Sequence, residues 1–289
     1  MTARHVSVVL FVFLAAAASG SLWAQSSVVP ADPCAGEDKV VMDVLDPALN
    51  GAHKVQPLQA MQSLAAAGCG DAAWVLGNLH RFGPELPGNP LPRDSIRARQ
   101  SLGQAGLAGV EDAYRDQAEL ALADGNARDA MLWTQVWLWL HDIDSARARK
   151  TAQGYDADLL QRATRAWRAA RLANAQIQPL LDEFFRERGP TLLAEHHRIP
   201  ERRARRPQLA LAKSPRVHPG DIGRRSGYVM FRVEAKPSGE VTRVFVESYG
   251  PTADVVERLR PLVKDLRLTP FDATEPMTGT LPIVVAVSR

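Results

Sequence analysis

The clearest hydrophobic pattern lies near the end of the chain, where apolar and polar residues alternate. Within 227–235, every second residue from Val229 onward is apolar, which is the period of a β-strand with one packed face. The turn sequence Lys-Pro-Ser-Gly at 236–239 leads to a second stretch at 240–246, in which Val244 and Val246 share a face. The pattern therefore predicts an antiparallel hairpin.

A helix and a closing strand are predicted after this hairpin. From Thr252 to Leu266 apolar residues recur at steps of three and four, so one helical face can cover the sheet. Pro261 lacks an N–H and is expected to bend or split that helix. The last strand is predicted at 281–287, and its Pro282 is tolerable if this strand forms a sheet edge.

The body of the chain, at 55–188, has a helical and repetitive pattern. The pair Ala-Gly at 67–68 recurs at 105–106, a separation of thirty-eight residues, and repeats of that length are typical of stacked helix pairs. A stripe of Trp133, Trp137 and Leu140 is interpreted as core, because its helical spacing alone explains it. Pro179 is expected to kink or divide the long helix predicted at 155–188.

The N-terminus predicts export from the cytoplasm. Arg4 precedes an apolar run that begins at Val6, and small residues lead to Ala24, which is the layout of a cleaved signal peptide at 1–24. An uncleaved membrane anchor is the alternative, because a spanning helix needs about 20 residues. Both alternatives place the rest of the chain outside the cytoplasm, in the periplasm. Residues 25–54 are predicted to form an irregular segment.

Cys34 and Cys69 are the only two cysteines of the chain. In an oxidising compartment an even pair most simply forms one disulfide. This bond would join the start of the mature chain to the first helical repeat.

Basic charge is concentrated between the two predicted domains. Residues 186–225 hold eleven Arg and Lys against four Asp and Glu, although the net charge of the chain is only +3. The stretch 189–213 is interpreted as a basic linker. Export argues against nucleic acid as its partner, whereas an anionic membrane or a cell-wall polymer would satisfy the same electrostatics.

We find no pattern of residues that predicts catalysis, a cofactor or a metal. The common hydrolase and phosphate-binding motifs do not occur in the sequence. His141, Asp142 and Asp144 are interpreted as a helix end, since no fourth metal ligand is suggested. His196 and His197 are interpreted as solvated residues of the linker.

Two family resemblances add to these predictions. The helical body resembles degenerate Sel1-like repeats, relatives of the tetratricopeptide family, at Ala67, Gly68, Ala72, Leu76 and Gly77, at Asp94, Ala98, Ala105, Gly106 and Ala113, and at Ala130 and Trp133. Residues 214–289 resemble the C-terminal domain of the TonB family at Pro215, Pro219, Gly227, Ser238, Gly239, Val241, Val244, Val246, Ser248, Pro270 and Gly279. Together they imply an α+β protein with a helical solenoid at 55–188 followed by a small ββαβ domain.

The TonB resemblance also implies a function. In that family the module binds an extended partner segment by adding it to the sheet edge, a role that would fall here on Ile283, Val284, Val285, Ala286 and Val287. The partner would be a protein of the cell envelope, with an outer-membrane transporter as one candidate. The chain departs from the family in its cleavable N-terminus, in the absence of a Pro-rich spacer and in His218 before Pro219.

The sequence therefore predicts an exported, non-enzymatic interaction protein. A membrane-anchored energy transducer of the TonB type is the first alternative. An undetected cell-envelope hydrolase is the second, for which the sequence offers only scattered acids and histidines.

Overall fold

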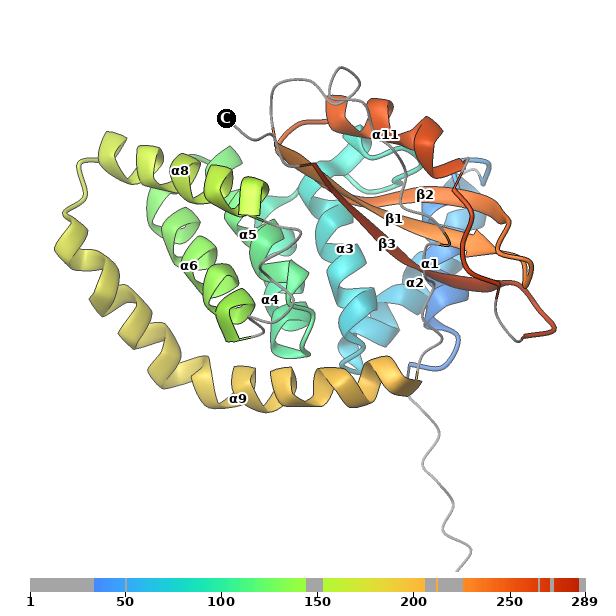
Figure 1. The fold of residues 1–289 in the computed structure, drawn as a ribbon, viewed down its shortest axis with the longest axis horizontal. Helices are drawn as coiled ribbons and strands as arrows, with labels where there is room; N and C mark the ends of the chain where they lie inside the picture. Colours follow the sequence, from blue (N-terminus) through green and yellow to red (C-terminus); the bar gives the residue numbers. More distant parts are fainter. Residues whose placement is uncertain are drawn as a thin grey trace, which may run out of the picture. The chain divides into compact units, whose positions relative to one another are not determined.

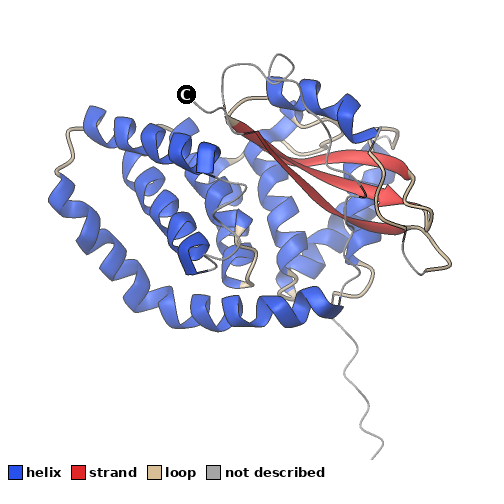
Figure 2. Cartoon of the chain, in the orientation of Figure 1, coloured by secondary structure: helices blue, strands red, loops and turns tan. Residues whose placement is uncertain are grey.

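The chain forms nine α-helices and one three-stranded sheet in the residues that the structure describes (Figure 2). In this computed structural model, those residues are 34–49, 51–143, 153–205, 212, 226–264, 266–270 and 273–285. The described residues belong to one compact unit, which lies within Pro33–Arg289. The predicted α+β class is confirmed at this level.

Consecutive helices of the N-terminal part pack against one another, α3 against α4 and α5 against α6 (Figure 1). Their small residues allow close approach, and the larger ones fill the core. The stripe at Trp137 and Leu140 is buried, as predicted, and Trp133 packs against the same core. The helices are α1 (Glu37–Leu45), α2 (Gly51–Ala66), α3 (Gly70–Phe82), α4 (Ser95–Leu107), α5 (Asp112–Ala123), α6 (Ala127–Ile143), α8 (Gln153–Ala169) and α9 (Ile177–Arg205), with 3-10 turns η1 (Gly83–Glu85) and η2 (Asn174–Gln176).

Three of these helices end in the same glycine turn. Gly68, Gly109 and Gly125 have positive φ, and in each case the next residue donates its N–H to a carbonyl five positions back. This is the Schellman arrangement, which favours glycine because the turn is left-handed. The predicted equivalence of Gly68 with Gly106 was wrong, since Gly109 forms the second turn and Gly106 lies within α4 against the Tyr114 ring.

The long helix predicted at 155–188 is divided, but not by Pro179. The first part, α8, ends at Ala169. Arg171 in the turn that follows has a φ of +57°, and α9 begins at Ile177. Pro179 therefore lies in the first turn of α9, where a missing N–H costs no hydrogen bond. The stretch predicted as a basic linker at 189–213 is helical as far as Arg205.

The sheet contains β1 (Gly227–Ala235), β2 (Val241–Gly250) and β3 (Met277–Val285) in the order β2-β1-β3, with both pairs antiparallel. The predicted hairpin is confirmed. Its turn requires Gly239, whose φ is +82° and where an added Cβ would lie 2.0 Å from the carbonyl oxygen of Leu268. The last strand begins earlier than predicted, so Gly279 lies within it.

One face of the sheet is covered by α11 (Asp254–Lys264), as predicted. Val229, Phe231 and Val233 of β1 are buried, and so are the apolar residues Val255 and Leu259 of α11. Pro261 does not split the helix, which was one of the two expected effects, because α11 continues through it. We attribute this tolerance to the apolar face of the helix, whose burial on the sheet outweighs one missing hydrogen bond.

The other face of the sheet packs on the helical part of the chain, with contacts to α1, α3, α5 and α8 (Figure 1). The sheet therefore lies between two layers of helices. Among the described helices, none has the length and apolar content to cross a membrane. The predicted signal peptide or anchor at 1–24 lies outside the described residues.

Candidate functional site

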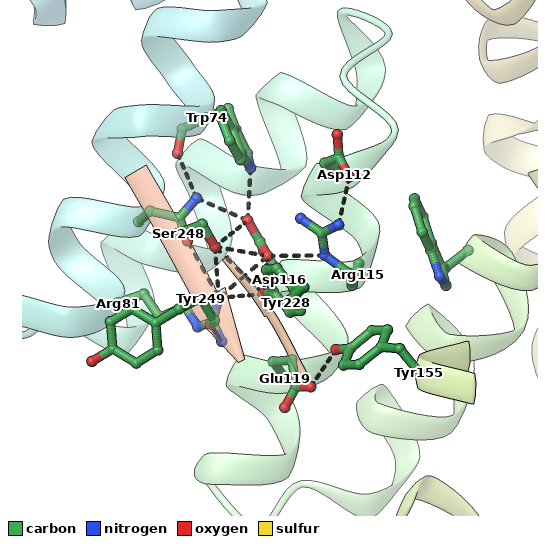
Figure 3. Close-up of polar contacts among 12 residues, drawn as sticks. Trp74, Arg81, Asp112, Arg115, Asp116, Glu119, Tyr155, Tyr228, Ser248 and Tyr249 are labelled. Carbon is green, nitrogen blue, oxygen red and sulfur yellow. Dashed lines mark hydrogen bonds and ion pairs between the residues drawn. The ribbon is translucent and has the colours of Figure 1, made fainter. Parts of the chain in front are cut away.

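A buried carboxylate, Asp116, lies at the centre of the contact between helices and sheet (Figure 3). Trp74 and Asn78 of α3 donate to it at 2.7 and 2.9 Å. Tyr228 of β1 and Ser248 of β2 donate from the opposite side. Residues of three sequence-distant segments therefore converge on one side chain.

Two buried arginines lie beside Asp116, and one of them, Arg115, also pairs with Asp112 at 2.7 Å. Arg81 lies one helical turn beyond Asn78 on the same face of α3, and its Nη1 is 3.3 Å from Asp116 Oδ1. The Arg81 guanidinium also donates to the carbonyl oxygen of Tyr249 at 3.1 Å. Arg115 stacks its guanidinium over the Tyr228 ring, 3.7 Å from the centroid, with its Nε 3.6 Å from Asp116 Oδ1.

A second buried carboxylate, Glu119, lies one turn farther along α5. Arg162 of α8 donates to both of its oxygens, at 2.7 and 2.5 Å, and the Tyr155 hydroxyl donates as well. The Tyr155 ring meets the Tyr228 ring edge to face, with centroids 5.1 Å apart. Glu119 thus links α8 to the same interface.

These carboxylates are ionised members of a buried network of ion pairs and hydrogen bonds. Burial raises the pKa of Asp116, but Arg115, Arg81 and the hydrogen bonds outweigh it and leave this pKa below its usual value. The pKa of Glu119 is lowered in the same way, because Arg162 and Tyr155 outweigh the effect of burial. A general acid needs a proton at working pH and a path to substrate, so this arrangement favours a structural role.

The third polar group of this interface is centred on Arg232 of β1. Its Nε donates to Glu247 of β2 at 2.5 Å, and its Nη1 donates to Asp38 of α1 at 2.8 Å. Thr280 of β3 donates to the other oxygen of Glu247 at 2.9 Å. Burial raises the pKa of Glu247, and Arg232 and Thr280 offset only part of that effect.

Acid is expected to weaken the fold through Asp116 and Glu119. An unfolded carboxyl titrates near pH ~4, and both folded-state pKa values lie below the ordinary ones. Their contribution to stability is therefore present above pH ~4 and is lost as the pH falls through the folded-state values. Glu247 acts in the opposite sense, because burial raises its pKa and its protonation removes a buried charge. We expect the two carboxyls with lowered pKa values to outweigh this single group.

The free energy of unfolding, measured by denaturant titration at a series of pH values from about 6 to 3, checks this expectation. Replacing Asp116 with asparagine, which cannot titrate, should make the decline shallower. A wild-type stability that stays level or increases below pH ~4 would contradict the assignment of two depressed carboxyls.

The predicted binding residues lie at the end of an edge strand. Ile283, Val284 and Val285 are the last residues of β3 and pair with Val229, Tyr228 and Gly227 of β1. Ala286 and Val287 lie outside the described residues. The expectation that the closing strand forms a sheet edge is confirmed, since β3 pairs only with β1 in the described part of the chain.

Alternate residues of β3 point their backbone groups away from the sheet. Pro282, which has no N–H, lies opposite Met230, so this pair is one of the non-bonded pairs of an antiparallel ladder. At the hairpin turn the backbone N–H of Lys236 donates to the carbonyl of Glu240 at 2.9 Å, which agrees with even-numbered residues of β1 facing β2. The outward row of β3 is therefore Thr278, Thr280, Pro282 and Val284.

The second edge of the sheet is more strongly protected. In the first half of β2, the Arg243 side chain donates to Glu234 at 2.5 Å and lies 3.9 Å from Asp46. The second half, from Val246 to Gly250, is buried. Charged side chains and burial are the usual devices that block edge pairing, so β3 offers the freer edge.

Other sequence predictions have mixed outcomes. The disulfide between Cys34 and Cys69 is confirmed, with Cα atoms 5.5 Å apart. His196 is not a solvated linker residue: it lies in α9, and its Nδ1 contacts the Glu111 carboxylate. The side chains of His141 and Asp142, and all of Asp144, lie outside the described part. No group of metal-binding side chains occurs among the described residues.

The buried interface was not predicted from the sequence. The spacing of Trp74, Asn78 and Arg81 on one face of α3 is a detectable signal, since a polar stripe flanked by apolar residues needs a partner. Comparisons with protein-family models, with curated proteins and with solved structures found no match for this chain.

Proposed function

We propose that this protein is a non-enzymatic interaction protein that binds an extended segment of a partner protein by strand addition to β3. The observation that carries the proposal is the outward row of β3, which no other strand pairs with in the described residues. In strand addition, main-chain hydrogen bonds provide affinity and alternating side chains provide selectivity. The TonB resemblance of 214–289 supports the same role.

The helical part would then act as the support of the binding edge. Buried hydrogen bonds join β1 and β2 to Asp116 of α5, and another joins Arg81 of α3 to the carbonyl oxygen of Tyr249 in β2, so the sheet presents β3 from a rigid base. A preformed edge lowers the entropy cost of capturing a flexible segment. Action outside the cytoplasm, on a cell-envelope partner, is part of this proposal and is supported by the N-terminal sequence and by the disulfide.

Hydrogen exchange along β3 is expected to alternate. The amides of Gly279, Leu281 and Ile283 face β1 and should exchange slowly, whereas those of Thr278, Thr280 and Val284 face outward and should exchange quickly. Adding a strand-forming peptide of nine residues, the length of β3, should slow the outward amides only. The measurement is residue-resolved exchange by NMR with and without peptide.

A pair of substitutions at Val284 provides the matched control. Val284→Pro removes an outward N–H while leaving the bonds of Ile283 and Val285 to β1, so peptide binding should fall at least severalfold. Val284→Ala keeps the N–H and should bind like the wild type. Unchanged outward exchange on saturation with peptide, or equal binding by both variants, would place the binding surface elsewhere.

A further inference from the structure

A row of polar side chains crosses the sheet and stops at the free edge. Glu247 of β2, Arg232 of β1 and Thr280 of β3 are neighbours on the face toward α1, joined by hydrogen bonds of 2.5 and 2.9 Å. Arg232 and Thr280 are direct partners in the strand register. A strand added to β3 would place its own residue next in this row, beside Thr280.

Asp38 of α1 gives this end of the row a negative charge. Its carboxylate accepts from Arg232 Nη1, yet 45% of the Asp38 side chain is exposed, against 3% for Arg232 and none for Glu247. One guanidinium is thus shared by two carboxylates, which leaves an excess of negative charge on the face toward α1. Because α1 contacts β3, that charge lies close to the binding edge.

The opposite face of β3 has an apolar character. Met277, Leu281 and Ile283 alternate with the outward row and lie on the side of α11, and Leu281 is buried. Gly279, paired with Val233, has no side chain and leaves room for a larger neighbour. An added strand would therefore meet apolar groups on one face and Asp38 on the other.

We infer that the partner segment carries lysine or arginine at the position that pairs with Thr280, with apolar residues on either side of it. This inference rests on the proposed function, since it describes what the same edge selects. Thr280 points its backbone outward, so the residue opposite it forms a hydrogen-bonded pair and projects its side chain on the face of α1. There a cation lies beside the exposed carboxylate of Asp38 and extends the row of alternating charges.

Two synthetic peptides test the selection. Both have the nine-residue length of β3 and alternate threonine with valine, with lysine at the centre of one and glutamate at the centre of the other. By fluorescence anisotropy at low salt, the lysine peptide should bind about threefold to fivefold more tightly, the range expected for a partly exposed ion pair. The net charge of the chain is +3, so long-range attraction alone would favour the glutamate peptide.

Removing the charge of Asp38 tests whether this carboxylate causes the preference for the lysine peptide. Asp38→Asn should reduce the ratio of the two affinities toward one, whereas Asp43→Asn should leave it unchanged. Asp43 makes the control because it lies on the same helix, pairs with Lys39 and acts on Arg243 of the other sheet edge. High salt should reduce the wild-type ratio as well, which tests the inference without any variant.

The outcomes separate the two proposals. If neither peptide binds the wild-type protein, strand addition itself is wrong. If both peptides bind with equal affinity, or if Asp38→Asn keeps the full preference while melting like the wild type, the selection for a basic residue is wrong and the binding edge stands.

Discussion

Replacing Asp116 with alanine is expected to lower the free energy of unfolding by about 3–5 kcal/mol, the range for breaking a buried ion pair by removing one partner. The substitution leaves Arg81 and Arg115 buried, and it removes the acceptor of Trp74, Asn78, Tyr228 and Ser248. Stranded buried donors each cost further free energy. For a unit of this size, the melting temperature should fall by on the order of 10 °C.

A carboxylate at the C-terminal end of the same helix supplies the control. Asp124 follows α5 and pairs with the partly exposed Arg93 and Arg99 at 3.4 and 3.9 Å. Asp124→Ala should cost less than about 1 kcal/mol. Denaturant titrations of the three proteins measure the difference. Equal losses in the two variants would show that Arg81 and Arg115 find other partners, and that Asp116 does not hold the sheet to the helices.

The contacts of Asp116 also explain why the sequence predicted the packing of only one face of the sheet. Alternation in 227–235 was enough to predict β1 and the face under α11, because it depends only on local period. For the residues between, Tyr228, Met230 and Arg232, the alternation predicted no packing partner, but all three are buried. Their burial depends on partners as far away as 112 and 194 residues, which no local pattern contains.

Predictions of where helices break were wrong where a local rule competed with packing. Pro261 was expected to break a helix, yet α11 continues because its apolar face is held on the sheet. Pro179 was expected to divide a helix that in fact ends earlier, at Ala169. The edge position of β3, by contrast, was predictable, since Pro282 in a strand is compatible only with an edge or with a strand end.

The register of β3 changes which residues a binding test should target. The sequence placed binding on 283–287 as a group, whereas the register separates Val284, which faces outward, from Ile283 and Val285, which bond to β1. A proline at Val285 would therefore damage the sheet itself. A proline at Val284 acts on the outer edge, and this distinction came from the position of Pro282 opposite Met230.

Loss of the disulfide is expected to destabilise the protein by about 3–4 kcal/mol, the chain-entropy estimate for a loop of this length. Cys34 and Cys69 are 35 residues apart in sequence, and the bond fixes the start of α1 beside the N-terminus of α3. Two polar contacts depend on that placement. The Glu37 carboxylate accepts from the backbone N–H of Ala72 at 2.6 Å, and Asp38 holds Arg232.

The double substitution Cys34→Ser with Cys69→Ser measures this contribution, by denaturant titration with and without a reductant. The reductant should lower the stability of the wild type to that of the double variant and leave the variant unchanged, because only the wild type has a disulfide to reduce. Release of α1 should also speed hydrogen exchange in α1 ahead of α5, whose own contacts remain. If complete reduction leaves the stability of the wild type unchanged, the contacts of Glu37 and Asp38 already restrain the loop. In that case these two carboxylates, and not the covalent bond, keep α1 beside the binding edge.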